Sequence, residues 1–315
     1  MKLSKTILYI LFLQMFACGQ TFELESFLDK AQHQISFYQE TFKNLVAEEE
    51  KTYEYFNKKG KLEETRRIKS VFIVYQSSKN ANITEFRNVI EFNGKSVARN
   101  DEKLADFFEK LEKSDSSDEQ FERLRKESNR YEGRSRAFGM TLGQGTCLQK
   151  FYREFFEFRL VGKDKIEGRD VLIVEYKQTK PTLRIKVNGT DAEWKAEPNG
   201  ISYDTFLPNN FRPTNPRLKG KIWLDAETAQ IWRNEFTVTI QPAFLSKPVI
   251  SGEYLDEYQS SKFGILVPKR FYFVSKRFVG KGEKDLVATK AAAKTFEYTN
   301  FRKPDSEVKD TKIGN

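Results

Sequence analysis

Residues 220–240 read GKIWLDAETAQIWRNEFTVTI, two runs of β-branched and aromatic residues joined by a polar connection. In the second run apolar and polar side chains alternate, with Trp232, Phe236, Val238 and Ile240 on one face and Arg233, Glu235, Thr237 and Thr239 on the other. A period of two is typical of an antiparallel strand with one buried and one solvated face. The stretch therefore predicts a β-hairpin in a sheet that is covered on one side.

Similar stretches precede and follow this hairpin. They cover residues 51–58, 67–76, 85–92, 170–176, 182–187, 249–258, 266–276 and 294–301. The dipeptide Asn93-Gly94, after the third of them, suits a two-residue hairpin turn. No alternation of strands with helices is present. We therefore expect roughly ten strands in an antiparallel sheet.

Two segments have helical spacing instead. Residues 22–50 place apolar side chains at steps of three and four, which predicts a long amphipathic helix. Residues 101–131 repeat this spacing in two pieces, divided by the polar run from Ser114 to Asp118. The pattern predicts an α+β fold, in which a strongly curved antiparallel sheet has its helices gathered on one side.

The amino terminus has the form of a secretory signal peptide over residues 1–19. Lys2 and Lys5 precede an apolar run at 6–16, which is too short to span a membrane as a helix. Two sites are possible for cleavage of the signal peptide. Signal peptidase would cut after Gly19, whereas a lipobox-like reading places the cut before Cys18, whose thiol would then carry a lipid. Either reading predicts export to the periplasm, the outer membrane or the exterior of a bacterium.

The remaining chain is expected to form one domain over residues 20–302, followed by a disordered charged tail at 303–315. Loss of Lys2 and Lys5 with the signal lowers the formal net charge from +9 to +7. The charges alternate in sign along the chain and form no basic block, so a nucleic-acid partner is not indicated. Weak attraction to an anionic membrane surface is compatible with this charge.

Few residues carry obvious chemistry. The chain has one histidine, His33, and two cysteines, Cys18 and Cys147. These numbers exclude a zinc site built from His and Cys, and no serine lies in a Gly-x-Ser-x-Gly motif. His33 is off the apolar stripe and is expected on the surface, whereas Cys147 is expected to be buried. No catalytic residue, metal or cofactor is predicted.

Acidic residues offer one enzymatic alternative. Glu48, Glu49 and Glu50 would end the predicted first helix, where their charges oppose the helix dipole. Arg66 or Arg67 on the next hairpin would then be their partners. A carboxylate-dependent hydrolase would need two such acids to converge in a cleft with raised pKa values.

The hairpin at 220–233 and the run Gly264-Ile-Leu-Val-Pro268-Lys-Arg-Phe resemble short patterns of the outer-membrane lipoprotein-sorting (lipoprotein-carrier) superfamily. The order of elements is similar as well: an exported chain, a leading helix, a long meander and inserted helices. This resemblance implies a half-barrel with the helices packed in its concave side. It also implies a protein that carries lipid or lipoprotein.

A second resemblance runs from about residue 37 to 275. Residues 42–49, 67–74, 86–97 and 127–131 look like a family of exported bacterial proteins of unknown function, common in acidobacteria. The chain departs from that family around 133–150. No functional residues are known to us for this family, so none is carried over.

Phenylalanine is the remaining signal, with 28 in the chain. Nine of them are candidates for lining a cavity beneath the sheet: Phe107, Phe108, Phe151, Phe155, Phe156, Phe158, Phe236, Phe271 and Phe273. We therefore hypothesise a non-enzymatic envelope protein that binds a lipid, acyl chain or lipoprotein. The main alternative is a structural or interaction protein whose phenylalanines fill a closed core. The oligomeric state is left open.

Overall fold

The structure is a computed structural model, and it describes most of the chain after the amino terminus. The described residues are 23–43, 45–76, 83–97, 126–132, 140–182, 184–188, 201–204, 213–242, 245–280 and 286–303, together with 109, 113, 119 and 123. The predicted signal peptide, Cys18 and nearly all of the predicted tail lie outside these ranges and stay predictions.

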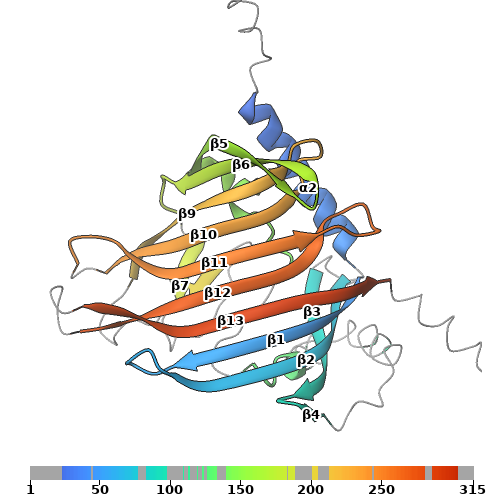
Figure 1. Cartoon of the computed structure of the whole chain (residues 1–315), viewed down its shortest axis with the longest axis vertical. Helices are drawn as coiled ribbons and strands as arrows, with labels where there is room; N and C mark the ends of the chain where they lie inside the picture. The colour runs from blue at the N-terminus through green and yellow to red at the C-terminus, as the bar shows by residue number, and fades with distance from the viewer. Residues whose placement is uncertain are drawn as a thin grey trace, which may run out of the picture.

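Eleven strands form one antiparallel sheet in the order β4-β3-β2-β1-β13-β12-β11-β10-β9-β6-β5 (Figure 1). Their bounds are β1 Val46–Phe56, β2 Leu62–Gln76, β3 Ile83–Phe92, β4 Lys95–Ser96, β5 Phe156–Ile166, β6 Arg169–Gln178, β9 Pro213–Asp225, β10 Ile231–Pro242, β11 Val249–Gln259, β12 Val267–Val279 and β13 Val287–Arg302. A separate parallel pair joins β7 (Ile185–Asn188) to β8 (Ile201–Asp204).

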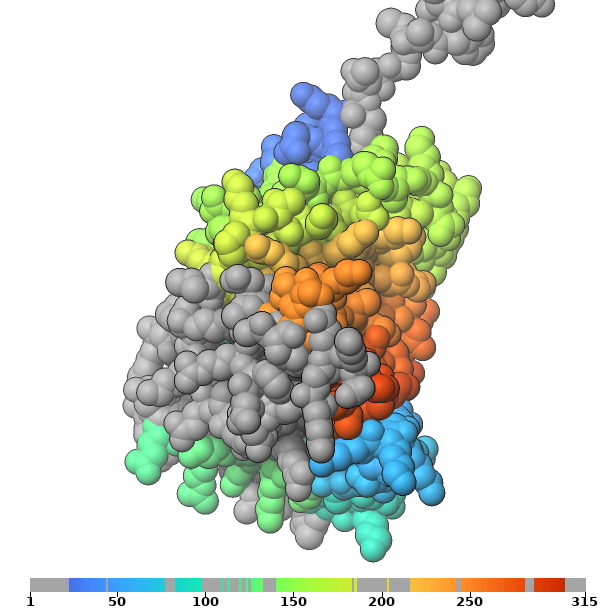
Figure 2. Space-filling view, turned by 90° about the vertical axis from the view of Figure 1, so that its left-hand side faces the viewer, coloured from blue at the N-terminus to red at the C-terminus, as the bar shows by residue number. Residues whose placement is uncertain are grey.

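The sheet is open, because β4 and β5 at its two ends are not paired with each other. Figure 2 shows the same order from the side, with yellow-green β5 and β6 above, orange and red strands in the middle, and blue β1 and β2 below. The large curved antiparallel sheet predicted from the alternating stretches is confirmed. The Asn93-Gly94 hairpin turn between β3 and β4 is confirmed too, with positive φ at both residues.

The leading helix is shorter than predicted. Helix α2 covers Leu24–Phe42, and the chain is a β-strand from Val46 onward, so the prediction of helix to residue 50 is wrong. From Glu49 the buried positions recur every second residue, at Lys51 and Tyr53. β1 pairs with β13 on one side and β2 on the other, so hydrogen bonds from both neighbours hold it extended.

Helix α2 packs on the inner face of the sheet. Its Tyr38 and Phe42 rings stack at 4.8 Å, and Phe42 reaches Phe72 of β2 at 6.4 Å between ring centroids. Tyr38 meets Tyr258 of β11 edge-on at 6.4 Å. One face of the helix is thus buried, at Phe27, Leu28, Ala31, Ile35, Tyr38 and Phe42.

Residues 140–155, called here the inner segment, lie between α2 and the sheet. They contain two 3-10 turns, η1 (Thr146–Leu148) and η2 (Arg153–Phe155), before β5 begins at Phe156. The Thr141 carbonyl accepts a hydrogen bond from Tyr38 Oη at 2.7 Å. The Thr141 backbone N–H donates to Glu85 of β3 at 3.0 Å. The inner segment therefore links α2 to one end of the sheet.

The predicted helical pair at 101–131 lies mostly outside the described residues. Residues 109, 113, 119, 123 and 126–128 are helical. Farther along the chain, the 3-10 turn η2 is followed directly by strand β5.

The outer face of the sheet carries charges of alternating sign. Paired positions on seven neighbouring strands form a row from β3 to β10: Glu91, Lys69, Glu50, Glu297, Arg270, Glu257 and Arg233. Only Glu50 and Glu297 are like charges side by side. The polar face predicted from residues 231–240 is therefore the solvated outside of the sheet.

Gly220 of β9 lies at a close approach between strands. A Cβ atom there would be 2.2 Å from the Glu235 carbonyl oxygen and 2.8 Å from the Tyr176 hydroxyl. Both strands beside β9 are hydrogen-bonded to it, so neither can move away freely. Glycine at this position is required by space and not by its backbone angles.

We predict that Gly220→Ala destabilises the protein by about 3 kcal/mol, because the added methyl group collides with backbone. Gly162→Ala in β5 is the matched control. Its Cβ would be 3.6 Å from Ile173 Cδ1, an ordinary contact. Urea unfolding followed by circular dichroism measures both variants, and equal stability of the two would contradict the close approach.

Candidate functional site

The inner face of the sheet is crossed by a row of aromatic side chains that is interrupted on two strands. Strand pairing places six rings in this aromatic row, on β1, β12, β11, β10, β6 and β5 in spatial order: Tyr53, Phe273, Tyr254, Phe236, Tyr176 and Phe158. Lys294 of β13 stands between the first two, and Gly220 between Phe236 and Tyr176. The row therefore crosses almost the whole sheet.

The central rings of the row are in direct contact. Phe236 and Tyr254 stack at 4.7 Å with an interplanar angle of 8°, and Phe273 follows at 5.7 Å from Tyr254. Tyr203 of β8 packs on both Tyr254 and Phe236, at 5.1 and 5.8 Å. Tyr254, Phe236 and Phe158 remain partly exposed, so the row offers apolar surface on the inner side.

A polar triplet interrupts this apolar face. It consists of Tyr176 on β6, Asn234 on β10 and Asp256 on β11. Tyr176 Oη donates to Asn234 Oδ1 at 2.8 Å, and Asn234 Nδ2 donates to Asp256 Oδ2 at 3.1 Å. Among the residues described, no basic side chain forms an ion pair with Asp256.

Burial raises the pKa of the Asp256 carboxyl to about 7, and the hydrogen bond from Asn234 opposes this rise only partly. A carboxylate withdrawn from water without a counter-ion is costly, so it takes up a proton more readily. The pKa values of Tyr38 and Tyr258 beside it are raised well above the usual value, by burial first and by the charge of nearby carboxylates second. These phenols stay neutral, and Asp256 titrates near neutral pH.

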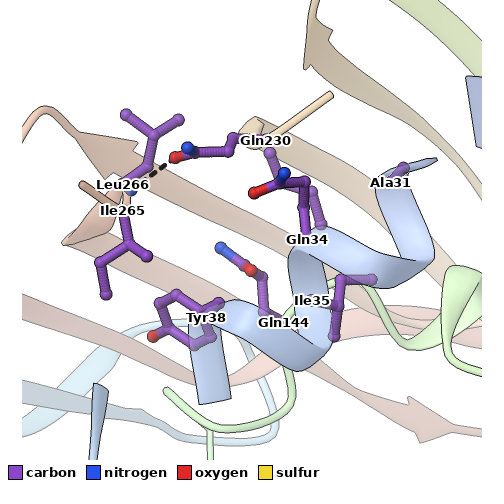
Figure 3. A pocket seen from close by; sticks show the side chains of 9 residues that line it. Ala31, Gln34, Ile35, Tyr38, Gln144, Gln230, Ile265 and Leu266 are labelled. Atoms are coloured by element: carbon purple, nitrogen blue, oxygen red, sulfur yellow. Dashed lines mark hydrogen bonds between the residues drawn. The ribbon is translucent and has the colours of Figure 1, made fainter. Parts of the chain in front are cut away.

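A small pocket lies between α2 and the ends of β10 and β12 (Figure 3). Its volume is about 10 Å³, which is room for about one water molecule. Gln34, Tyr38 and Gln144 point into it, and Gln230 Oε1 on its rim accepts a hydrogen bond from the Leu266 N–H at 2.8 Å. The helix is thus closely packed on this part of the inner face.

Charged side chains fill the other end of the inner face. Glu49, Lys51, Glu85, Arg87 and Glu132 form what we call the ion network, and all five are buried. Arg87 donates from Nε and Nη2 to the Glu49 carboxylate, at 2.9 and 3.1 Å. It also donates from Nη2 to Glu85 at 2.8 Å, while Lys51 pairs with Glu132. The network therefore joins two strands, β1 and β3, to the segment around residue 132.

The positive charges decide the ionisation of the network. Burial alone would raise the pKa of Glu49, but Arg87 and Lys51 outweigh it and hold that pKa below its usual value. The pKa of Arg87 is raised well above its usual value, because Glu49, Glu85 and Glu132 outweigh the effect of burial. Glu49 is therefore a fixed carboxylate and Arg87 a fixed cation.

This arrangement corrects the expectation for the glutamates at residues 48–50. They lie in β1 and not at a helix end, and Glu49 pairs with Arg87 instead of Arg66 or Arg67. Glu48 and Glu49 point to opposite sides of the sheet, one exposed and the other buried. They cannot converge in a cleft, and the lowered pKa of Glu49 does not suit a general acid.

The lone histidine and Cys147 lie where the sequence analysis expects them, on the surface and in the interior. His33 is exposed on α2, and Cys147 is buried in η1. Burial raises the pKa of the Cys147 thiol far above its usual value, so it does not form a thiolate nucleophile. Among the residues that the structure describes, no group of His, Cys, Asp or Glu is arranged to hold a metal ion.

The nine candidate phenylalanines separate into three sets. Phe107 and Phe108 lie outside the described residues. Phe151 is 50% exposed, with the Arg184 guanidinium 5.2 Å from its ring, so the prediction that it lines the interior is wrong. It precedes η2 in a turn that faces outward. The others are buried or partly buried, namely Phe155, Phe156, Phe158, Phe236, Phe271 and Phe273.

Sequence reasoning missed the polar triplet and the tyrosines around it. The stretch from Tyr254 to Tyr258 held a signal, because Tyr254, Asp256 and Tyr258 alternate along a predicted strand. An acid between two aromatic residues of one strand face is placed toward the apolar side of the sheet. The partners on other strands, Asn234 and Tyr176, depend on strand order and had no local signal.

The similarities of the chain to known proteins are distant. No protein-family model matches the chain, and no curated protein matches its sequence significantly. Similar solved structures include a DUF1329-family protein from Desulfovibrio piger, with 10% identity, coverage of 88% of this chain and 93% of that chain, and a TM-score of 0.30. At this level they say nothing of what the present chain binds.

Two further solved structures belong to the superfamily that the sequence resemblance named. One is a domain from Vibrio parahaemolyticus classed with outer-membrane lipoprotein-sorting proteins, with 10% identity, coverage of 89% and 98%, and a TM-score of 0.29. The other is a LolA-superfamily protein from Nitrosomonas europaea, with 9% identity, coverage of 90% and 95%, and a TM-score of 0.29. Both are similarities of fold.

We predict that Arg87→Gln destabilises the protein by about 3–5 kcal/mol, because it leaves Glu49 and Glu85 as buried charges without their partner. Arg159→Gln is the control, since Arg159 also pairs with a glutamate but its side chain is 74% exposed. Chemical unfolding at pH 7 compares the two. An Arg87→Gln protein as stable as the control would show that the ion network contributes little.

A second prediction concerns Asp256. Its folded pKa of about 7 lies above the ordinary 3.8, so its contribution to stability falls as pH rises between these values. Asp256→Asn should therefore match the wild type near pH 4 and exceed it at pH 8 by about 2 kcal/mol, a figure reduced for partial exposure to water. Urea unfolding across this range tests it, and a constant difference between the two proteins would refute the raised pKa.

Proposed function

We propose that this chain is a non-enzymatic envelope protein whose inner sheet face binds an apolar ligand, either a free lipid or the acyl chain of a lipoprotein. The observation that carries the proposal is the aromatic row. It continues across the sheet, and Phe158, Phe236 and Tyr254 within it are not fully covered. A row of rings with exposed faces suits a long hydrocarbon chain lying across the strands.

The energetics favour a ligand of this kind. Each methylene group removed from water contributes about 0.8 kcal/mol, so a twelve-carbon chain would gain about 9 kcal/mol before ordering costs. Rings such as Phe236 and Tyr254 impose no directional requirement on a hydrocarbon chain. Recognition of the chain itself would therefore be broad, as a carrier requires.

The candidate catalytic groups support binding over hydrolysis. Glu48 and Glu49 face opposite sides of β1, and Glu49 is held as a carboxylate by Arg87. Cys147 is buried with a raised pKa, and His33 is exposed on the surface of α2. The carboxylate-dependent hydrolase is therefore the weaker alternative.

A second candidate function is a structural or interaction protein with a closed core. The close packing of α2 favours it, because the pocket beside Ile35 and Gln144 has a volume of only about 10 Å³. In this alternative the side chains of the aromatic row only fill the core. The chain then binds partners through the outer surface of the protein.

We further propose location in the bacterial periplasm or at the outer membrane. The signal-like residues 1–19 support export, and lipidation of Cys18 would attach the mature chain to a membrane. In the described part of the chain, no helix has the length and apolar character needed to cross a membrane. Mass spectrometry of the mature amino terminus distinguishes an acylated Cys18 from a chain that begins at Gln20.

Lipid binding is tested on full-length protein purified from its own host. We expect native mass spectrometry to detect a co-purified lipid, and the delipidated protein to take up a fluorescent fatty acid. Phe236→Ala should weaken uptake by about tenfold, the equivalent of roughly 1.4 kcal/mol of lost ring contact. Thr237→Ala, on the outer side of the same strand, should leave uptake unchanged. Neither lipid nor uptake would favour the closed-core alternative.

A further inference from the structure

The polar triplet lies within the face proposed to hold an apolar chain. Asp256 pairs across the strands with Phe271 on one side and Asn234 on the other. Phe271 is fully buried and Asn234 is 3% exposed, whereas Asp256 itself is only half-buried. The residue as a whole thus keeps some exposed surface on the inner face, although its carboxyl is largely withdrawn from water.

At the Asp256 end, the triplet can still accept hydrogen bonds. Tyr176 uses its proton on Asn234, and Asn234 uses its amide on Asp256 Oδ2. Within the described ranges, Asp256 Oδ1 receives no hydrogen bond. A carboxylate can accept about four, so Asp256 is prepared to accept a donor from a ligand.

In the part of the chain that the structure describes, no basic side chain forms an ion pair with Asp256, and the buried Lys294 of β13 lies beyond Phe273 in the aromatic row. The titratable groups that face it are phenols: Tyr38 of α2, Tyr176 of β6, Tyr203 of β8 and Tyr258 of its own strand. The inner-face cations of the ion network are already paired with the three glutamates there. The ionised carboxyl therefore lacks a counter-charge that a ligand could supply.

We propose that the triplet Asp256–Asn234–Tyr176 is a recognition site for a cationic head group, and that it selects alkyl chains that carry an ammonium group. This inference rests on the proposed function, since the aromatic row would hold the chain while Asp256 binds the head. An ammonium group donates hydrogen bonds and neutralises the buried charge in one contact. An anionic head group would meet a like charge instead.

The protonation of Asp256 makes this selection depend on pH. Below neutral pH the carboxyl is protonated and has no charge to offer an ammonium group. Above it the carboxylate forms, so affinity for an alkylammonium ion rises between pH 6 and pH 8. A bound cation favours the charged carboxylate, so the rise in affinity begins at a lower pH than the titration of the free protein.

The experiment compares three twelve-carbon probes that differ only in the head group: dodecylamine, dodecanol and dodecanoate. Each displaces a neutral fluorescent probe from full-length protein below its critical micelle concentration. At pH 8 we expect the wild type to bind dodecylamine at least about tenfold more tightly than dodecanol, the effect of one charge-assisted contact. The preference should shrink at pH 6.

Matched variants assign the preference to the site. Asp256→Asn should bind dodecylamine and dodecanol equally at both pH values. Glu253→Gln removes a charge from the outer side of the same strand, where it pairs with Lys276, and should keep the wild-type preference. Tyr176→Phe, which leaves the carboxyl in place but frees Asn234, should lower the preference several-fold. It also serves as the test if Asp256→Asn does not fold.

The outcomes separate the two proposals. Equal affinity of the wild type for all three probes, or a preference that survives in both Asp256→Asn and Tyr176→Phe, overturns the cation site and leaves apolar binding in place. Loss of the preference in Glu253→Gln assigns it to overall charge and also overturns the site. Failure of all three probes to bind overturns the proposed function itself, and the cation site with it.

Discussion

An open antiparallel sheet of eleven strands has an inner face that other parts of the chain must cover, as Tyr203 of the small β7–β8 sheet does at Phe236 and Tyr254. Its apolar side chains must be buried by whatever the chain places in the concavity, because an exposed apolar face of this size is unstable in water. Helix α2 and the inner segment (residues 140–155) supply that cover. The contrast between an aromatic inner row and a charged outer row follows directly from this requirement.

Two polar clusters break the apolar inner face, and they differ in charge balance. In the ion network each buried charge has an opposite partner, so it acts as a structural clamp between β1–β3 and the segment near Glu132. In the polar triplet, Asp256 accepts a hydrogen bond from Asn234, but no basic side chain of the described chain pairs with it. The carboxylates of the ion network are already paired with cations, whereas the unpaired carboxylate of Asp256 would gain free energy from a ligand of opposite charge.

The predictions that failed were made from local sequence, whereas contacts between distant parts of the chain decide these features. The helix was extended to residue 50 because Leu45 and Val46 continue its spacing, yet the strand partners of β1 decide that stretch. Arg66 and Arg67 were expected to pair with the glutamates because they are near in sequence. The actual partner, Arg87, comes from β3, a strand two places away in the sheet. Phe151 was assigned inward by composition, although its turn faces water.

The sequence by itself determined the alternating strands, the Asn93-Gly94 turn, the solvated outer face and the burial of Cys147. These properties depend on near neighbours, since the period of a strand and the backbone angles of a turn are local. Only the tertiary structure decided which charges are paired and that Asp256 joins Asn234 and Tyr176. Those contacts join residues 22 to 81 positions apart, and the order of strands that creates them arises from burial of the whole inner face.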